Sequence, residues 1–179
     1  MIKIIKSTEK DFREIAAIGK ITVEEAHRDS CSAAELNEYL ENNYNDDAIK
    51  KELSDIKNIY NIIYFKEQPA GFSKIIFNCS HPNIQPENVA KLDRIYLLKE
   101  YHNLKLGYEL LKSNLELSKN NGQEGVWLFT WIHNKKAVNF YLKTGFTIIG
   151  THQFKVTETR YNPNHHMYFN LNQDVRAES

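Results

Sequence analysis

Leucine residues recur at helical spacing in the middle of the chain. They occupy positions 106, 110, 111 and 115, so they define one apolar face of a helix. Directly upstream, residues 95–98 form a short run of branched and aromatic side chains, which predicts a buried strand. Residues 99–105 are polar and turn-like. The segment 92–121 therefore predicts a strand, a tight loop and a helix with Gly107 at its start.

The first third of the chain predicts one strand followed by three helices. Isoleucines and lysines at residues 2–5 suggest the strand, and Thr8 is suited to cap a helix whose apolar side carries the isoleucines at 15, 18 and 21. Ser32 and Glu35 match a capping box, which predicts a second helix through residue 43. A third, short helix is predicted over residues 46–53.

The rest of the chain predicts five further strands, at residues 59–65, 72–77, 125–131, 146–149 and 165–171. The first two of these read as an antiparallel hairpin with its turn at residues 67–71. The strand at 125–131 is apolar on both faces, as in a fully buried strand. A helix ending at Gly145 precedes the last two strands, which a polar loop should join.

The junction between strand and helix near Gly107 is suited to bind an anion. The first turn of a helix leaves amide N–H groups without partners inside the helix, and the aligned peptide dipoles add partial positive charge there. A phosphate can bind such a terminus without a cationic side chain. Gly107 has no Cβ, so a ligand or a neighbouring backbone can approach closely.

Residues 102–107, His-Asn-Leu-Lys-Leu-Gly, resemble the pyrophosphate-binding loop of the GNAT superfamily of N-acetyltransferases, whose pattern is Q/R-x-x-G-x-G/A. Gly107 fits the last position. His102 replaces the usual Gln or Arg, and Lys105 replaces the first Gly. Lys105 disfavours positive φ and adds a cation near the phosphates. We expect acetyl-CoA binding to persist, because the backbone amides of residues 103–108 should carry most of it.

Residues 126–146 carry a second and more specific motif. In the superfamily a strand is followed by Asn and then by a helix that carries A-x-x-F-Y and ends in G-F. The matching residues are Asn134, Ala137, Phe140, Tyr141, Gly145 and Phe146. The resemblance implies a single-domain α/β fold at residues 1–171, with a mixed, mostly antiparallel sheet of about six to seven strands flanked by helices. Residues 172–179 are expected to form a polar C-terminal tail.

The resemblance also implies the site residues. Tyr141 would be the catalytic general acid near the thioester sulfur, since a phenol can donate a proton at neutral pH. Asn134 would bind the CoA arm and could also cap its helix, while Lys143 could reach a phosphate or lie in solvent. The complete set expected to bind acetyl-CoA is Ile95, Tyr96, Leu97, His102, Asn103, Leu104, Lys105, Leu106, Gly107, Tyr108, Asn134 and Lys143.

Nearly the whole chain is similar to bacterial spermidine/spermine N-acetyltransferases of the polyamine-catabolism type. That similarity implies a small polyamine-like amine as acceptor, with Glu24, His27, Asp93 and Trp131 at the acceptor site. A cationic polyamine favours acidic groups, for which Glu24, Asp93 and Glu100 are the candidates. The general base stays open between Asp93, Glu24, His27, Tyr96, His133 and a water relay.

Composition narrows the functional classes. The 179 residues contain 41% apolar and 26% charged residues, and 23 Lys plus Arg balance 23 Asp plus Glu. Zero net charge gives no support for binding to nucleic acid or a membrane surface. The chain shows no apolar signal core, and Cys31 and Cys79 lack CxxC spacing, so a cytoplasmic location is expected. No metal is expected, because His165 and His166 alone are too close in sequence to form a site.

Other functions are compatible with the same motifs. An acetyltransferase of this type could instead modify a protein N-terminus, a lysine or an amino-sugar drug. The chain could also be a degenerate acyl-CoA-binding module, with Lys105 marking lost catalysis. Retention of Tyr141 and Asn134 argues against the last alternative. A homodimer is a further possibility, in which Trp127, Phe129 and the tail strands would lie either in the interface or in the core.

Overall fold

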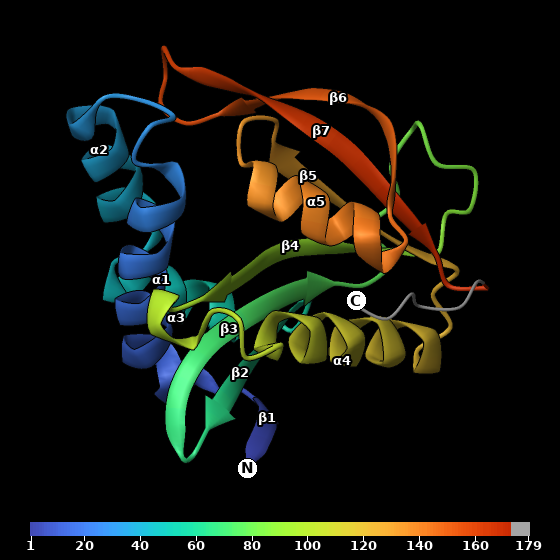
Figure 1. The fold of residues 1–179 in the computed structure, drawn as a ribbon, viewed down its shortest axis with the longest axis horizontal. Helices are drawn as coiled ribbons and strands as arrows, with labels where there is room; N and C mark the ends of the chain where they lie inside the picture. Colours follow the sequence, from blue (N-terminus) through green and yellow to red (C-terminus); the bar gives the residue numbers. More distant parts are fainter. Residues whose placement is uncertain (173–179) are drawn as a thin grey trace.

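The computed structural model describes residues 1–172 and shows a seven-stranded sheet with helices on both faces (Figure 1). The strands are β1 (Ile2–Lys6), β2 (Asn58–Phe65), β3 (Gln68–Ile76), β4 (Val89–Leu97), β5 (Gly125–Trp131), β6 (Thr147–Lys155) and β7 (Tyr161–Asn170). The α-helices are α1 (Phe12–His27), α2 (Ala33–Asn43), α3 (Asp46–Ser54), α4 (Leu106–Asn120) and α5 (Lys135–Thr144). Short 3₁₀ helices occupy η1 (Glu9–Asp11) and η2 (Lys99–Tyr101). The predicted α/β fold with a mixed sheet is confirmed.

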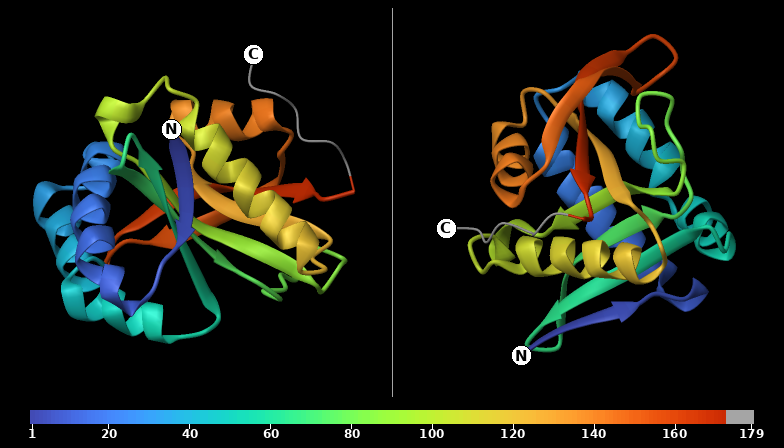
Figure 2. Two further views of the ribbon diagram at one scale, coloured as in Figure 1. Left: turned by 90° about the horizontal axis from the view of Figure 1, so that it is seen from below. Right: turned by 90° about the vertical axis from the view of Figure 1, so that its right-hand side faces the viewer.

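The strands follow the order β1-β2-β3-β4-β5-β7-β6, and every neighbouring pair except β4 and β5 is antiparallel. Helices α1, α2 and α3 cover one face, where Ile15, Leu40 and Ile49 pack on Phe72. Helices α4 and α5 cover the other face (Figures 1 and 2). The four leucines of α4 at positions 106, 110, 111 and 115 are buried there, as their spacing predicted.

The signals that start the N-terminal helices act as expected, with one adjustment. Thr8 caps η1, and the α-helix proper begins only at Phe12. Ser32 and Glu35 form the predicted capping box at the start of α2. Ile21, which was expected on the buried side of α1, is instead 50% exposed.

The hairpin between β2 and β3 is confirmed, but its turn is shorter than predicted. Phe65 pairs with Gln68, so the turn is only Lys66 and Glu67, with φ of 49° and 67°. Two residues with positive φ match the twist of antiparallel strands. Pro69 and Gly71, which suggested a longer turn, lie within β3, where a register shift accommodates the proline.

Three predicted strands have different bounds. Strand β4 starts at Val89 rather than residue 95, and its fully buried residues lie in the first half; residues 95–97 are only half-buried because they face a cavity. The prediction of a polar loop between residues 149 and 165 is wrong, because β6 and β7 continue through most of these residues as a two-stranded ribbon. Every residue of β6 is exposed or half-buried, so hydrophobicity does not mark the length of this strand.

Strands β4 and β5 diverge after a short parallel contact. Their pairing covers only Val89–Lys91 on β4, opposite Gly125–Trp127 on β5. Beyond Lys91, β4 remains paired with β3 on one side but has no strand partner on its β5 side. An unpaired strand edge therefore opens in the middle of the sheet, and a ligand with amide groups can bind it as an added strand.

Several expectations concern features outside the sheet. No helix within residues 1–172 is long and apolar enough to span a bilayer. The same residues contain no group of three or more His, Cys, Asp or Glu side chains arranged for a metal ion. Trp127, one candidate for a dimer interface, is buried against Ile84 and Val89 in the core. Of the predicted tail, residues 173–179 lie outside the described residues, and the domain boundary at residue 171 stays a prediction.

Candidate active site

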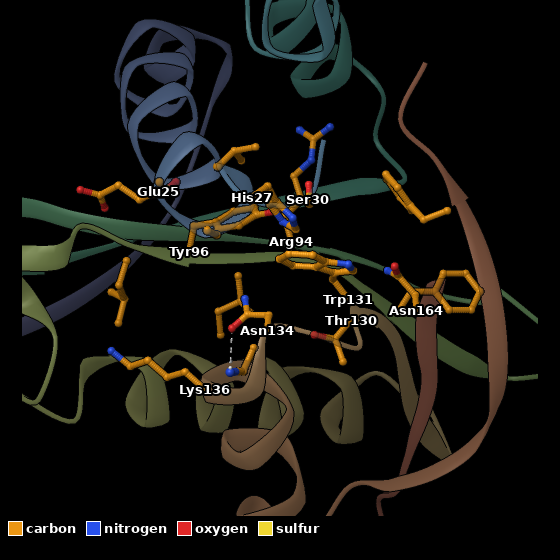
Figure 3. Close-up of a pocket in the computed structure, with 18 of the residues that line it drawn as sticks. Glu25, His27, Ser30, Arg94, Tyr96, Thr130, Trp131, Asn134, Lys136 and Asn164 are labelled. Atoms are coloured by element: carbon orange, nitrogen blue, oxygen red, sulfur yellow. Dashed lines mark hydrogen bonds between the residues drawn. The ribbon is translucent and has the colours of Figure 1, made fainter. Parts of the chain in front are cut away.

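A cavity of about 1440 Å³ occupies the opening between β4 and β5 (Figure 3). One end is lined by the β4–α4 loop and the start of α5. The other end lies between α1, α2 and the ribbon of β6 and β7. The cavity is therefore lined both by the segments predicted to bind acetyl-CoA and by those predicted to bind the acceptor.

Backbone groups of β4 form one wall of the cavity. Ile95, Tyr96 and Leu97 all line it, and the edge of β4 facing β5 has no strand partner there. The Leu97 carbonyl is partly engaged, since His102 Nε2 lies 3.2 Å from it. The amides and carbonyls of an extended arm could pair with the remaining groups of this edge.

The loop before α4 has the backbone shape of an anion-binding turn. Lys105 adopts φ 58° directly before α4, and Asn103 adopts φ 67°. Lys105 thus takes the left-handed conformation in which a glycine is favoured, at a cost of about 1–2 kcal/mol. Gly107 lies in the first turn, where an added Cβ would approach Leu97 Cδ1 to 3.3 Å. Leu104 is the only residue of the predicted 102–108 loop that does not line the cavity.

Four lysines line this same end of the cavity: Lys99, Lys105, Lys136 and Lys143. Lys136 Nζ lies 2.9 Å from His102 Nδ1, so His102 joins the end of β4 to the start of α5. With Lys136 donating, His102 carries its proton on Nε2 and donates to the Leu97 carbonyl. His102, which replaces the expected Gln or Arg, therefore links the loop before α4 to α5 through these two contacts.

Helix α5 presents Tyr141 to the cavity. Asn134 caps the helix by accepting a hydrogen bond from the Ala137 amide (3.1 Å), and Gly145 ends it with φ 110°. Tyr141 is 7% exposed and contacts the ring of Phe146. Burial, with a smaller contribution from Tyr96, raises the pKa of Tyr141 above its usual value. The phenol therefore stays protonated at neutral pH and can donate to a group in the cavity.

The far end of the cavity is rich in aromatic side chains. His27 at the end of α1 faces Trp131 at the end of β5, with 5.9 Å between ring centroids. Figure 3 shows these two side chains beside Arg94, with Asn164 approaching from β7. Tyr39 of α2 and Phe154 of β6 also line this end, 6.3 Å apart.

The predicted acceptor and base residues are only partly brought together. His27, Asp93, Tyr96 and Trp131 line the cavity. Asp93 is paired with Lys91 (2.8 Å) and Lys74 (3.1 Å). Burial would raise the pKa of Asp93, but these two lysines outweigh it and lower the pKa to about 2. Asp93 is therefore a poor general base, since it holds a proton too weakly.

The other three candidates do not line the cavity. Glu24 is exposed on α1, with its carboxylate 3.6 Å from Arg28. Glu100 is exposed on η2. His133 packs against the Trp131 ring at 5.5 Å without reaching the cavity. The structure therefore places Glu24, Glu100 and His133 away from any acceptor bound between α1 and β5.

Several residues that line the acceptor end were not predicted from the sequence, among them Tyr39, Tyr44, Arg94, Phe154 and Asn164. Arg94 carried a signal, because a charged Asp93-Arg94 pair interrupts an otherwise apolar strand. Tyr39 and Tyr44 carried none, since aromatic residues near the end of an amphipathic helix usually pack in the core.

Acid should destabilise the fold through His27. Burial lowers the pKa of His27 from 6.5 to about 4. Between these values the unfolded chain binds a proton at His27 that the folded chain does not, so stability falls as pH decreases. At a pH of about 5 this loss amounts to about 2 kcal/mol. Urea denaturation at neutral pH and at about pH 5 should show a smaller decline for His27→Gln than for wild type; an unchanged decline would contradict the assignment.

The comparison with known proteins agrees with this geometry. The sequence model of the Acetyltransferase (GNAT) family matches residues 21–146. An uncharacterized N-acetyltransferase encoded in the pepI 3′ region of Lactobacillus delbrueckii subsp. lactis is 27% identical over 160 residues, covering 89% of this chain and 92% of that protein.

Two solved structures extend the comparison to the fold. The crystal structure of PaiA N-acetyltransferase from Thermoplasma acidophilum in complex with coenzyme A has a TM-score of 0.75 at 19% identity, covering 95% of this chain and 99% of that one. A putative streptothricin acetyltransferase from Bacillus anthracis, in complex with acetyl coenzyme A, has a TM-score of 0.55 at 23% identity, covering 67% and 66%. Both similar folds were solved with the coenzyme bound.

Proposed function

The chain belongs to the GNAT family of acetyltransferases and is an acetyl-CoA-dependent N-acetyltransferase; on that premise we propose that it acetylates a small primary amine by direct attack, with Tyr141 as general acid. The observation that carries this proposal is the position of Tyr141. Its protonated phenol lines the cavity where β4 and β5 diverge, between the loop before α4 and the aromatic acceptor end.

The reaction requires one bond to form and one to break. The amine nitrogen attacks the thioester carbonyl carbon, and the carbon–sulfur bond breaks as the carbonyl re-forms. The departing sulfur takes a proton from the Tyr141 hydroxyl, the amine nitrogen gives one proton to water, and the Tyr141 phenolate takes a proton back from water before the next turnover. A positioned acid of this kind typically contributes about 100- to 10,000-fold to the rate. No covalent enzyme intermediate is needed, which fits a cavity whose only cysteine is Cys31 near its rim among the described residues.

Acetyl-CoA binding would use three features already described. The unpaired edge of β4 at residues 95–97 would receive the amide-bearing arm. The amides of residues 103–108 would hold the pyrophosphate at the start of α4, assisted by the nearby lysines. Asn134 and Lys143 line the same end of the cavity and would contact the rest of the coenzyme.

Proton removal from the amine would end in water, with His27 positioning the relay. His27 and Tyr96 both line the cavity. Burial raises the pKa of Tyr96, so its phenol keeps its proton at pH 7 and cannot act as the base. Burial lowers the pKa of His27 to about 4, so its neutral imidazole can accept a hydrogen bond from the amine or from a water but holds a proton too weakly to be a strong base.

A polyamine is the narrower acceptor that the sequence resemblance implies. Three carboxylates line the cavity without a lysine partner, those of Glu25, Asp29 and Glu38, and all three residues are exposed, whereas Glu158 is paired with Lys155 (2.8 Å). A long cation could reach them from the aromatic interior. Spermidine and spermine therefore belong in the first acceptor panel, together with protein N-terminal peptides, lysine and amino sugars.

The test is CoA release from acetyl-CoA in the presence of that panel. We expect release that depends on at least one small primary amine. If no amine is acetylated although acetyl-CoA binds, the proposed acceptor class is wrong.

Lys105 provides a separate test of the coenzyme site. We expect Lys105→Gly to change the free energy of unfolding by no more than about 1 kcal/mol, because relief of the left-handed backbone offsets the added freedom of the unfolded chain. Lys105→Ala removes the same charge and keeps the strain. Both variants should bind acetyl-CoA within about tenfold of wild type, since backbone amides carry the binding. A wild-type dissociation constant in the millimolar range or weaker, measured by calorimetry, would contradict this assignment.

A further inference from the structure

A buried cluster of charges lies beneath the acceptor end of the cavity. Arg94 Nη2 donates to Glu52 Oε1 (2.9 Å), and Lys74 Nζ lies 2.6 Å from Glu52 Oε2. Lys74 and Lys91 both pair with Asp93. Only 9% of the Arg94 side chain is exposed. The ion pairs thus join β3 and β4 to α3 directly under the acceptor end.

The cations in this cluster outnumber the carboxylates. Three cationic side chains, Lys74, Lys91 and Arg94, are balanced by only Glu52 and Asp93. Charge interactions are strong where water is largely excluded, so an unbalanced positive charge there attracts an anion. The carboxylates at the exposed rim are separate from this cluster and make no ion pair with it.

Arg94 has donors left for a ligand. Of its five N–H groups, one donates from Nη1 to the Tyr60 hydroxyl (2.8 Å) and one from Nη2 to Glu52, while Nε lies 4.0 Å from Asp93 Oδ2. Its guanidinium lies 4.7 Å from the centre of the Tyr44 ring, which holds it in place. Figure 3 shows Arg94 within the cavity beside His27 and Trp131. An arginine in this position can bind a planar carboxylate with two parallel hydrogen bonds.

Tyr44 supplies a second, independent observation. Its side chain is fully buried and lines the cavity. Its hydroxyl lies close enough to Tyr96 to lower the pKa of that residue, but it makes no hydrogen bond of acceptable geometry within the described residues. Burying a hydroxyl without a well-aligned partner is unfavourable, and an acceptor atom on a ligand would satisfy it. Tyr39 and Tyr96 line the cavity around the same arginine.

We propose that Arg94 and the Tyr44 hydroxyl bind an anionic group on the acceptor, so the acceptor is a primary amine that also carries a carboxylate, as an amino acid does. This inference rests on the proposed N-acetyltransferase function and names its acceptor class. Arg94 would supply the charge and Tyr44 a hydrogen bond, and both would act as specificity-determining residues.

The site lies at a suitable place relative to the chemistry. Tyr44, Tyr96 and Tyr141 all line the same cavity as Arg94. A compact acceptor whose carboxylate binds at Arg94 can therefore extend its amine past Tyr96 towards Tyr141. The four lysines near the loop before α4 lie at the other end and remain available for the phosphates of the coenzyme.

The test uses acceptors matched in pairs. Each amino acid is compared with its methyl ester and with its decarboxylated amine, and O-phosphoethanolamine is included as an amine with a different anionic group. We expect kcat/KM for amino acids to exceed that for the uncharged counterparts by about 10- to 100-fold, as a charged hydrogen bond implies. Preference for the phosphorylated amine would assign the same site to phosphate rather than carboxylate.

Two variants separate recognition from folding. Arg94→Gln removes the charge but also a partner of Glu52, so Tyr44→Phe is the cleaner test, because the hydroxyl it removes makes no hydrogen bond of acceptable geometry within the described residues. We expect Tyr44→Phe to raise KM for the acid about tenfold, while the KM values for the methyl ester and for acetyl-CoA are unchanged and the melting temperature does not fall. Tyr64→Phe, far from the cavity and bonded to Glu14, is the matched control.

The outcomes distinguish this inference from the proposed function. If acids and esters react equally well, or if spermidine exceeds every amino acid, the anionic-acceptor inference is wrong while N-acetylation stands. If no amine at all is acetylated, the proposed function itself fails. If Tyr44→Phe lowers kcat/KM equally for the acid and for the ester, Tyr44 has only a structural role, and its proposed role in recognition is wrong.

Discussion

Replacing Tyr141 with phenylalanine should lower kcat by at least about tenfold, and by about 100- to 10,000-fold if proton donation to sulfur limits the rate. Phenylalanine keeps the ring and therefore its contact with Phe146. The cavity and the coenzyme end do not change, so KM for acetyl-CoA should stay within about twofold. An interaction made only in the transition state affects kcat in this way.

Steady-state CoA release and thermal unfolding together measure this effect. Tyr161→Phe is a suitable control, because Tyr161 is exposed at the start of β7 and does not line the cavity. If kcat of Tyr141→Phe is unchanged, Tyr141 is not the general acid. A lower melting temperature with equal loss of kcat would instead indicate a packing role.

Replacing Glu52 with alanine should destabilise the fold by about 3–5 kcal/mol, because it leaves buried cations without their partner. Glu52 accepts from Arg94, Lys74 and the Tyr60 hydroxyl, at 2.9, 2.6 and 2.7 Å. Burial raises the pKa of Glu52, but Arg94 and Lys74 outweigh it and lower the pKa overall. Glu52 is therefore ionised in the fold, and its loss affects several interactions at once.

Urea denaturation provides the comparison. Glu41→Ala removes a carboxylate from an exposed pair with Lys20 and should cost no more than about 1 kcal/mol. If Glu52→Ala costs no more than this control, the cluster beneath the cavity is not a coupled ionic network.

Local signals in the sequence predicted many elements well. The capping box at Ser32, the leucines of α4 and the left-handed Gly145 at the end of α5 all act over a few residues. Such signals are complete within a short segment, so no tertiary context is needed. The family motif around Tyr141 gave the fold for the same reason.

Features that depend on distant segments were not predictable. Strands β6 and β7 extend through a polar stretch, because pairing with each other and with β5 determines their length more than hydrophobicity does. Lys105 adopts positive φ although its side chain disfavours it, and the fold around the loop must hold it there. Neither the length of β6 and β7 nor the left-handed conformation of Lys105 can be predicted from the neighbouring residues in the sequence.

The arrangement of residues at the acceptor end of the cavity also depends on distant segments and was not predictable. The ion pairs of Arg94 with Glu52 join residues 42 positions apart, and Tyr44 approaches both only after α2 packs on the sheet. Glu24 was predicted at the acceptor site from the similarity to polyamine acetyltransferases, whose cationic acceptor favours acidic groups. The fold instead places Glu24 outside the cavity and Arg94 inside it.

Direct detection of the acetylated amine by mass spectrometry, alongside free CoA, is the measurement that tests the central claim. We expect one acetylated amine for each CoA released, with both signals lost together in Tyr141→Phe. Release of CoA without any acetylated amine would contradict the claim, because it would mean that the cavity transfers the acetyl group to water.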